Sequence, residues 1–408
     1  MIINIDRPQK SIHPVLNLGF RIFFLGSAIF AIITMLLWHL VLNGVLTFHG
    51  ANLNPVYWHA HEMIFGYALA VIAGFLLTAV KAWTGVPMPS NWRLLAIFML
   101  WALARICWAL SPALPSMQIG AMTADVLFWL AVSAVVVRAV LLVRQTRQMG
   151  IVAKLLLLLV CHCLFDAGVW LGQSQWQSTA LYLALFLVIG VVFTIGRRVL
   201  PFFIEKGIFV NQDGTPSGIV VKLPNSLWLD RGSLLAFLGL SLSVLLHLDA
   251  WIVSILASLT AIIHAKRLMG WYHRAIWQKP LLWSLYVSFW VMVLSLLLMA
   301  ILPWLGLNSS LGLHALALSG IGMTTIAMMA RVSLGHTGRN IHQPPKLFVW
   351  LFVLMIFCLL LRVFVPMWAD DYVRVLAYSQ ACWVMSFALF LWAYTKMLIS
   401  PRIDGIMG

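Results

Sequence analysis

Ionisable side chains stand within long apolar stretches of this sequence, and histidines are prominent among them. His61 and Glu62 lie near the start of one stretch, and His314 lies near the start of another. An unpaired ionisable group is costly inside a bilayer, so each of these residues is a candidate for function. Imidazoles bind haem iron and transition metals, whereas the carboxylates that a proton relay needs are few here. These residue types therefore predict a haem or metal site.

The clearest candidate is a haem held by two histidines, His61 and His314. Laying the segment around His61 on the segment around His314, at an offset of 253 residues, also brings Thr84-Gly85 onto Thr337-Gly338. Both histidines then enter the membrane at one depth, so we expect them to be axial ligands of a single iron, one from each of two facing helices. The alternative is a pair of interfacial histidines that form hydrogen bonds near lipid headgroups.

Three further histidines are candidates for binding copper. His59 and His61 are two residues apart, which is about 200° around an ideal helix, so they cannot serve one metal together. His59 could instead bind copper with His49, or simply cap its helix. His162 is the third candidate, and Asp166 lies one helical turn later on the same face, where a carboxylate would orient the imidazole. A buried hydrogen-bonded pair is the alternative for these last two residues.

Two arginines, Arg105 and Arg362, are expected near the same side of the membrane as these histidines. A guanidinium binds carboxylates through a planar fork, so each arginine is a candidate partner of the haem propionates. Each could equally form an ion pair with Asp125 or Asp166. We favour the ion pair for Arg105 and leave both roles open for Arg362. Glu62 is a candidate to orient a neighbouring histidine ligand.

Membrane-spanning helices must position these residues. The chain is 63% hydrophobic and only 9% charged, with a mean hydropathy of +0.99, a balance that excludes a water-soluble domain. Its apolar runs have the roughly 20-residue length that crosses a bilayer and are apolar all round, which favours helices over a β-barrel. We expect an all-α, polytopic membrane protein, with residues 1–408 in one domain of six plus six helices. The expected spans are residues 20–42, 60–81, 92–110, 120–144, 151–171, 176–199, 232–247, 250–268, 281–303, 311–333, 346–366 and 372–398.

The net charge of +15 could suggest a nucleic-acid partner, but the positions of the basic residues exclude one. With the N-terminus inside, all lysines and arginines except Arg105, Arg362 and Arg374 fall on the inner side. This is the positive-inside pattern of a protein whose partner is the lipid bilayer, with both termini in the cytoplasm. No lysine or arginine lies in the predicted outer loops, near residues 43–58, 111–119, 172–175 and 304–310.

Residues 201–230 form the one long connection and divide the chain into its two halves. Turn-forming residues from Asn211 to Gly218 precede the β-favouring run from Ile219 to Val221, so we expect a cytoplasmic loop with a small hairpin. The five cysteines all fall within predicted spans and do not form a disulfide framework. No Cys-x-x-Cys-His motif is present, which excludes a covalently attached c-type haem, and the haem that we expect is haem b.

Four separated blocks of this sequence resemble the NnrS family, in the right order and over most of the chain. The resemblance implies a bacterial inner-membrane protein that contains haem and copper and is associated with denitrification and with resistance to nitrosative stress. It also implies nitric oxide or a related small molecule as the molecule handled, and it leaves open a redox activity toward nitric oxide. A respiratory electron donor is a further candidate partner. The blocks are Trp58–Tyr67 with Ile72–Phe75, Gly196–Phe203, Lys279–Trp283, and His314–Leu318 with Ala330–Arg339.

The segment around His61 also resembles the second helix of subunit I of the haem-copper oxidases. There an Ala-His is followed by Met-Ile-Phe and by Gly-Phe, and the histidine binds a low-spin haem. The likeness implies a similar bundle of helices, with His61 and His314 as the axial pair and Arg362 beside a propionate. The oxidases place their copper ligands as one histidine on helix 6 and a pair on helix 7, but this chain has no histidine between His162 and His247. A binuclear centre that reduces oxygen or nitric oxide is therefore not expected.

Two functions of other classes stay open beside this one. A twelve-helix transporter would use the outer polar cluster as its substrate site. An assembly or metal-delivery factor for respiratory haem enzymes would carry haem in transit rather than keep it. A purified protein with neither a Soret band nor iron would favour the transporter, and substoichiometric haem would favour the assembly factor.

Overall fold

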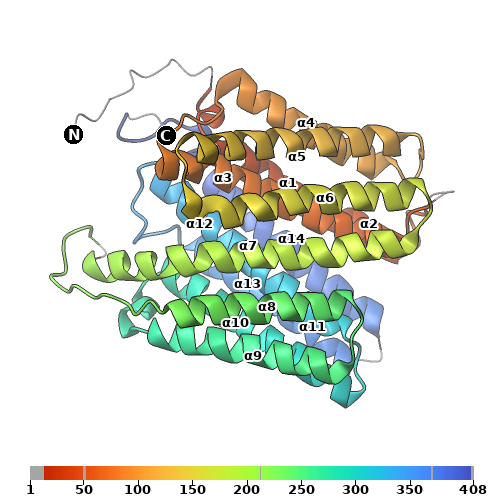
Figure 1. Cartoon of the computed structure of the whole chain (residues 1–408). Helices are drawn as coiled ribbons and strands as arrows, with labels where there is room; N and C mark the ends of the chain where they lie inside the picture. The colour runs from red at the N-terminus through yellow and green to blue at the C-terminus, as the bar shows by residue number, and fades with distance from the viewer. Residues whose placement is uncertain (1–12, 49–51, 212, 369–370, 406–408) are drawn as a thin grey trace.

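A computed structural model of the chain describes residues 13–48, 52–211, 213–368 and 371–405 (Figure 1). Within these residues it contains twelve helices long and apolar enough to cross a membrane, and no strands. The predicted all-α, multi-pass membrane fold is therefore confirmed. The spans are α1 (Gly19–Leu42), α2 to α3 (Pro55–Thr84), α4 (Asn91–Leu110), α5 (Met117–Leu142), α6 (Met149–Trp170), α7 (Ser174–Phe209), α8 (Leu227–Leu245), α9 (Ala250–Gly270), α10 (Pro280–Ile301), α11 to α12 (Ser310–His336), α13 (Leu347–Val363) and α14 (Tyr372–Ile399).

The spans pack mainly against their neighbours in sequence. α4 lies against α5, α6 against α7, α8 against α9 and α13 against α14, while α1 packs on both α3 and α14. In Figure 1, α4, α5 and α6 lie on one side of the molecule, α8, α9 and α10 lie on the other, and α7 runs between them. The chain reverses direction at each connection. One end of the bundle therefore contains the start of α2, the end of α4, the start of α5 and the end of α6. This end lies opposite the end where α1 begins and α14 ends.

The second and the tenth span are interrupted in the same way. Each contains a π-helical segment in its interior, and such segments occur frequently at functional sites. At or just after the end of each, a threonine precedes a glycine in the left-handed region, Gly85 with a φ of 72° and Gly338 with a φ of 75°. The offset of 253 residues therefore relates two spans of similar build. The second span consists of α2 (Pro55–His61), the π-helical η2 (Glu62–Ala68) and α3 (Leu69–Thr84), and the tenth of α11 (Ser310–Ala317), the π-helical η6 (Leu318–Met323) and α12 (Thr324–His336).

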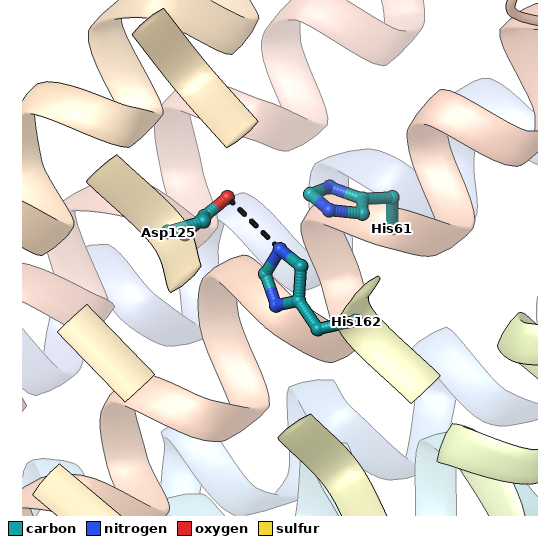
Figure 2. A group of neighbouring side chains, drawn as sticks. All are labelled: His61, Asp125 and His162. Atoms are coloured by element: carbon teal, nitrogen blue, oxygen red, sulfur yellow. Dashed lines mark ion pairs between the residues drawn. The ribbon is translucent and has the colours of Figure 1, made fainter. Parts of the chain in front are cut away.

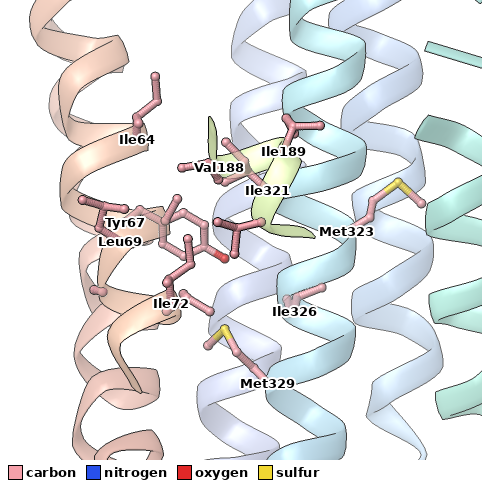
Figure 3. Close-up of a cluster of buried hydrophobic side chains, with 14 of the residues drawn as sticks. Ile64, Tyr67, Leu69, Ile72, Val188, Ile189, Ile321, Met323, Ile326 and Met329 are labelled. Carbon is pink, nitrogen blue, oxygen red and sulfur yellow. The ribbon is translucent and has the colours of Figure 1, made fainter. Parts of the chain in front are cut away.

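A buried apolar core joins these two spans to each other and to α7. Tyr67 and Ile72 of the second span, Val188 of α7, and Ile321 and Met329 of the tenth span gather in this core (Figure 3). All five side chains are buried. Close packing of this kind resists displacement, so the second and tenth spans are held at a fixed separation.

α7 is longer than the sequence predicts. The sequence places the end of the span before Pro201, where the predicted loop begins, but the helix continues through this proline to residue 209. The reason is a contact from another segment. Lys279 Nζ donates hydrogen bonds to the carbonyls of Gly207 and Val210, at a helix end where carbonyls have no partner within the helix. Beyond the helix, an isolated β-bridge closes the turn in place of the predicted hairpin.

Candidate metal and haem sites at one end of the bundle

Six ionisable side chains meet at the end of the bundle where α2 begins, and we call them the histidine-carboxylate cluster. They come from α2 and η2 and from α4, α5 and α6, and all six are buried. Figure 2 shows that three of them point toward one another. The cluster consists of His61, Glu62, Arg105, Asp125, His162 and Asp166.

The three side chains in Figure 2, His61, Asp125 and His162, lie within range of a shared metal ion. One ligand atom of each lies within 4.8 Å of the ligand atoms of the other two. The imidazole rings of His61 and His162 are nearly perpendicular, with an interplanar angle of 89° and centroids 5.4 Å apart. His162 Nε2 lies 3.6 Å from Asp125 Oδ2, which is too long for a hydrogen bond. An ion at about 2.0–2.2 Å from each atom would draw the three groups slightly closer together.

The hydrogen bonding of His61 leaves one ring nitrogen able to bind a metal ion. His61 Nδ1 donates a hydrogen bond to Glu62 Oε1 at 2.8 Å, since an ionised carboxylate can only accept. Nε2 then carries the lone pair, and this atom is buried without a hydrogen-bond partner among the described residues. Metal-binding histidines commonly donate their other N–H to a carboxylate in this way. The ring also packs against Trp108 and Phe165, at centroid distances of 4.7 and 4.5 Å.

His162 and Asp166 are close together but do not form a hydrogen bond with each other. Within the described residues, both ring nitrogens of His162 and both carboxylate oxygens of Asp166 are buried without hydrogen-bond partners. The two residues share a helix face, as their spacing predicts, with His162 Nε2 at 3.8 Å from Asp166 Oδ2. Buried polar groups without partners are costly. A cation bound beside them would offset that cost.

Arg105 joins the two other carboxylates of the cluster. Its Nη1 donates to Glu62 Oε1 at 2.6 Å, and its Nη2 forms an ion pair with Asp125 Oδ1. Asp125 Oδ2 also accepts a hydrogen bond from Trp108 Nε1 at 2.8 Å. The ion pair favoured for Arg105 is thus confirmed. Because the cluster contains three carboxylates and only one guanidinium, it can take up further positive charge.

A second group, the histidine-arginine cluster of His59, His314 and Arg362, lies on another side of α2. His59 stacks on Trp38 of α1, with ring centroids 4.4 Å apart, and lies close enough to His314 and Arg362 to interact with them electrostatically. His314 Nδ1 donates to the carbonyl of Ser310 at 2.8 Å. His314 Nε2 accepts from Arg362 Nη2 at 3.1 Å. This cluster therefore links α1, α2, α11 and α13.

The structure gives the predicted haem ligands different neighbours. His59 and His61 project to different sides of α2, as their spacing predicts. The ring of His61 contacts His162, whereas His314 contacts residues of α11 and α13. The pairing of His61 with His314 on one iron thus stays a prediction, without support from these contacts. His49, the other copper candidate, lies outside the described residues.

Asp125 and Trp108 have roles that the sequence does not reveal. The sequence suggests Asp125 only as an ion-pair partner, yet its carboxylate is also the third ligand-type group beside two imidazoles. A signal for this was present, because an acid inside an apolar span is itself a functional candidate. Trp108 is one of twenty tryptophans, and its hydrogen bond to Asp125 and its contact with the ring of His61 are visible only in the structure.

Comparison with known families places this geometry in context. The family model described as NnrS protein matches residues 14–402, nearly the whole chain. The chain belongs to the NnrS family. This confirms the resemblance carried by the four sequence blocks, whereas the likeness to oxidase subunit I stays a prediction. No curated protein matches the chain. The two histidine clusters contain the ligand types that haem iron and transition metals need.

Proposed function

We propose that this NnrS protein is a membrane metalloprotein of the nitric oxide response. In this proposal a transition metal binds to His61, Asp125 and His162, and haem b binds at the same end of the bundle. Family membership supports the nitric oxide response and the haem. The observation that carries the metal site is the buried, unpartnered Nε2 of His61 beside two further ligand groups.

The ligand set favours a first-row transition metal over calcium or magnesium. Calcium and magnesium prefer shells made only of oxygen atoms, whereas two of the three groups here are imidazoles. We propose copper, which the resemblance to NnrS proteins implies. When bound, a copper ion supplies an electron and a coordination position for a small molecule such as nitric oxide.

The residues around this site hold the ligands and exclude water. Glu62 fixes the proton of His61 on Nδ1, and Arg105 holds Glu62 and Asp125 in place. The rings of Phe65 and Phe165 lie 4.5 Å from His162 and His61, respectively. These apolar walls obstruct ions, but an uncharged diatomic molecule can cross them because it has no charge to desolvate.

We further propose that the site faces the outer side of a bacterial inner membrane, with both chain termini in the cytoplasm. The positive-inside distribution of lysine and arginine supports this orientation, because the site lies at the end of the bundle opposite the start of α1 and the end of α14. A respiratory electron donor is the partner that a redox-active haem and metal would require.

The copper content of a His162 variant tests the metal site. His162→Gln removes one proposed ligand without adding a charge, and we expect copper per chain to fall about tenfold or more. The matched control is His264→Gln, since His264 is also a buried histidine within a span and stacks on Phe193. Elemental analysis of the proteins purified in detergent gives the result.

Two outcomes of this experiment would count against the proposal. Equal copper in folded His162→Gln and in the wild type would reject His162 as a ligand. Wild-type protein that holds no transition metal after growth in copper-supplemented medium would reject the site as a whole.

A further inference from the structure

The histidine-arginine cluster has the opposite charge character from the histidine-carboxylate cluster. Arg362 donates to His314 and forms no ion pair among the described residues, and its Nη1 is buried there without a hydrogen-bond partner. A free metal ion would be repelled by this guanidinium, whereas a group that carries its own carboxylates would be attracted to it. The cluster therefore suits an anionic ligand.

Each histidine of this cluster has a ring nitrogen with a lone pair, and on His314 a ligand would replace the hydrogen bond from Arg362. The bond from His314 Nδ1 to the carbonyl of Ser310 leaves the lone pair on Nε2, the nitrogen that now accepts from Arg362. His59 Nδ1 is buried without a hydrogen-bond partner among the described residues. Its ring is held against Trp38 at an interplanar angle of 11°. Each imidazole is thus kept in one orientation by a neighbour, which favours ligation.

Two imidazoles and a guanidinium that has no carboxylate partner within the described part of the chain match the chemistry of haem. Haem iron takes two axial imidazoles, and its propionates pair with arginine. We propose that His59 and His314 are the two axial ligands of the haem and that Arg362 binds one of its propionates. This inference rests on the proposed function, which includes haem, and adds the residues that hold it. His61 then serves only the metal on the other side of α2.

The helices that carry these histidines also favour a cofactor between them. The π-helical segment η2 begins at Glu62, just after His59, and η6 begins at Leu318, one turn after His314. Further along the two spans, the hydroxyls of Tyr67 and Thr325 form a hydrogen bond of 2.7 Å. This bond and the apolar core fix the separation of the two spans, and so the separation of the backbones that carry the two ligands.

Haem spectra of three alanine variants test this pairing. His59→Ala, His314→Ala and His61→Ala are expressed with ample haem, and the haem content and the low-spin paramagnetic signal of each purified protein are measured. We expect His59→Ala and His314→Ala to lose the low-spin signal and to contain about tenfold less haem than the wild type. His61→Ala should keep the signal and the haem content of the wild type. Loss of low-spin haem in His61→Ala, with retention in His59→Ala, would overturn the inference.

A methionine variant separates a ligand from a merely structural residue. Methionine can also bind haem iron, and a histidine-methionine pair raises the reduction potential. His59→Met should therefore keep a low-spin haem at a higher potential than the wild type. An unchanged potential would show that His59 is not a ligand.

Copper content, measured on the same samples, distinguishes this inference from the proposed metal site. Wild-type protein with copper and no haem would overturn the haem assignment alone. Protein with haem lost in His59→Ala and no copper would support the haem assignment and reject the copper site.

Discussion

At the scale of single residues, two histidines on α2 belong to two different proposed sites, one on each side of the helix. His61 belongs to the metal site and His59 to the haem site. Positions 59 and 61 differ by about 200° around the helix axis, so one imidazole faces Trp38 of α1 and the other faces His162 of α6. Carboxylates surround His61, whereas the guanidinium of Arg362 lies near His59. The neighbouring charge therefore determines whether a free cation or an anionic cofactor is favoured.

Glu62→Gln tests the orienting role of a single carboxylate. The amide keeps the shape of the side chain but loses the charge that holds the proton on His61 Nδ1 and pairs with Arg105. We expect copper affinity to fall about 10- to 100-fold with haem content unchanged, as measured by competition with a copper chelator. Glu205→Gln is the matched control, because Glu205 accepts a hydrogen bond from Leu223 N away from the site. Equal copper affinity in Glu62→Gln and wild type would contradict the role.

Most of these residues can be found from the sequence, but their partners cannot. An ionisable group inside an apolar span is visible in the sequence alone, so residue type and position are enough to make His61, His162 and Arg105 candidates. Which helix faces each side chain depends on how twelve spans pack. Helices that are apolar nearly all round carry no stripe that reveals their packing faces. The contact between His61 and His162 therefore emerges only from the packed helices.

At the scale of elements, the spans are predictable but their interruptions and ends are not. Length and hydrophobicity locate all twelve spans, because the thickness of the bilayer sets both. The π-helical segments η2 and η6 have side chains like those of the flanking helix, so composition does not mark them. The extension of α7 through Pro201 depends on Lys279, which is distant in sequence.

Lys279→Met should loosen the end of α7. Lys279 Nζ donates to two carbonyls there and also contacts His342 Nδ1 at 3.2 Å. Burial, with the charges of Lys279 and Arg331, lowers the pKa of His342 to about 4, so its imidazole is neutral at pH 7 and can accept this bond. The bond to Gly207 is buried, so losing it leaves its carbonyl unsatisfied at a cost of about 1–3 kcal/mol. We expect faster amide hydrogen exchange in residues 203–209, measured by mass spectrometry.

The control for this variant is Lys266→Met, which changes an exposed lysine of α9. It should leave exchange in α7 unaltered. Identical exchange of residues 203–209 in the two variants would show that Lys279 does not stabilise the helix end.

At the scale of the whole molecule, both histidine clusters lie at one end of the bundle and are separated by α2. A helix with its side chains is about 10–12 Å across, so cofactors bound on its two sides would lie roughly that far apart. The fold itself follows from the sequence, because twelve apolar spans leave few other arrangements for the chain. The division of one polar end into two sites does not follow from the sequence, because it depends on which side chains face each other across the packed helices.

Anomalous X-ray scattering at the iron and copper absorption edges, from crystals of the purified protein, tests this division most directly. We predict a copper peak among His61, Asp125 and His162. We predict an iron peak between His59 and His314, on the other side of α2. A single iron peak between His61 and His314, or a copper peak away from His162, would contradict the assignment of two separate sites.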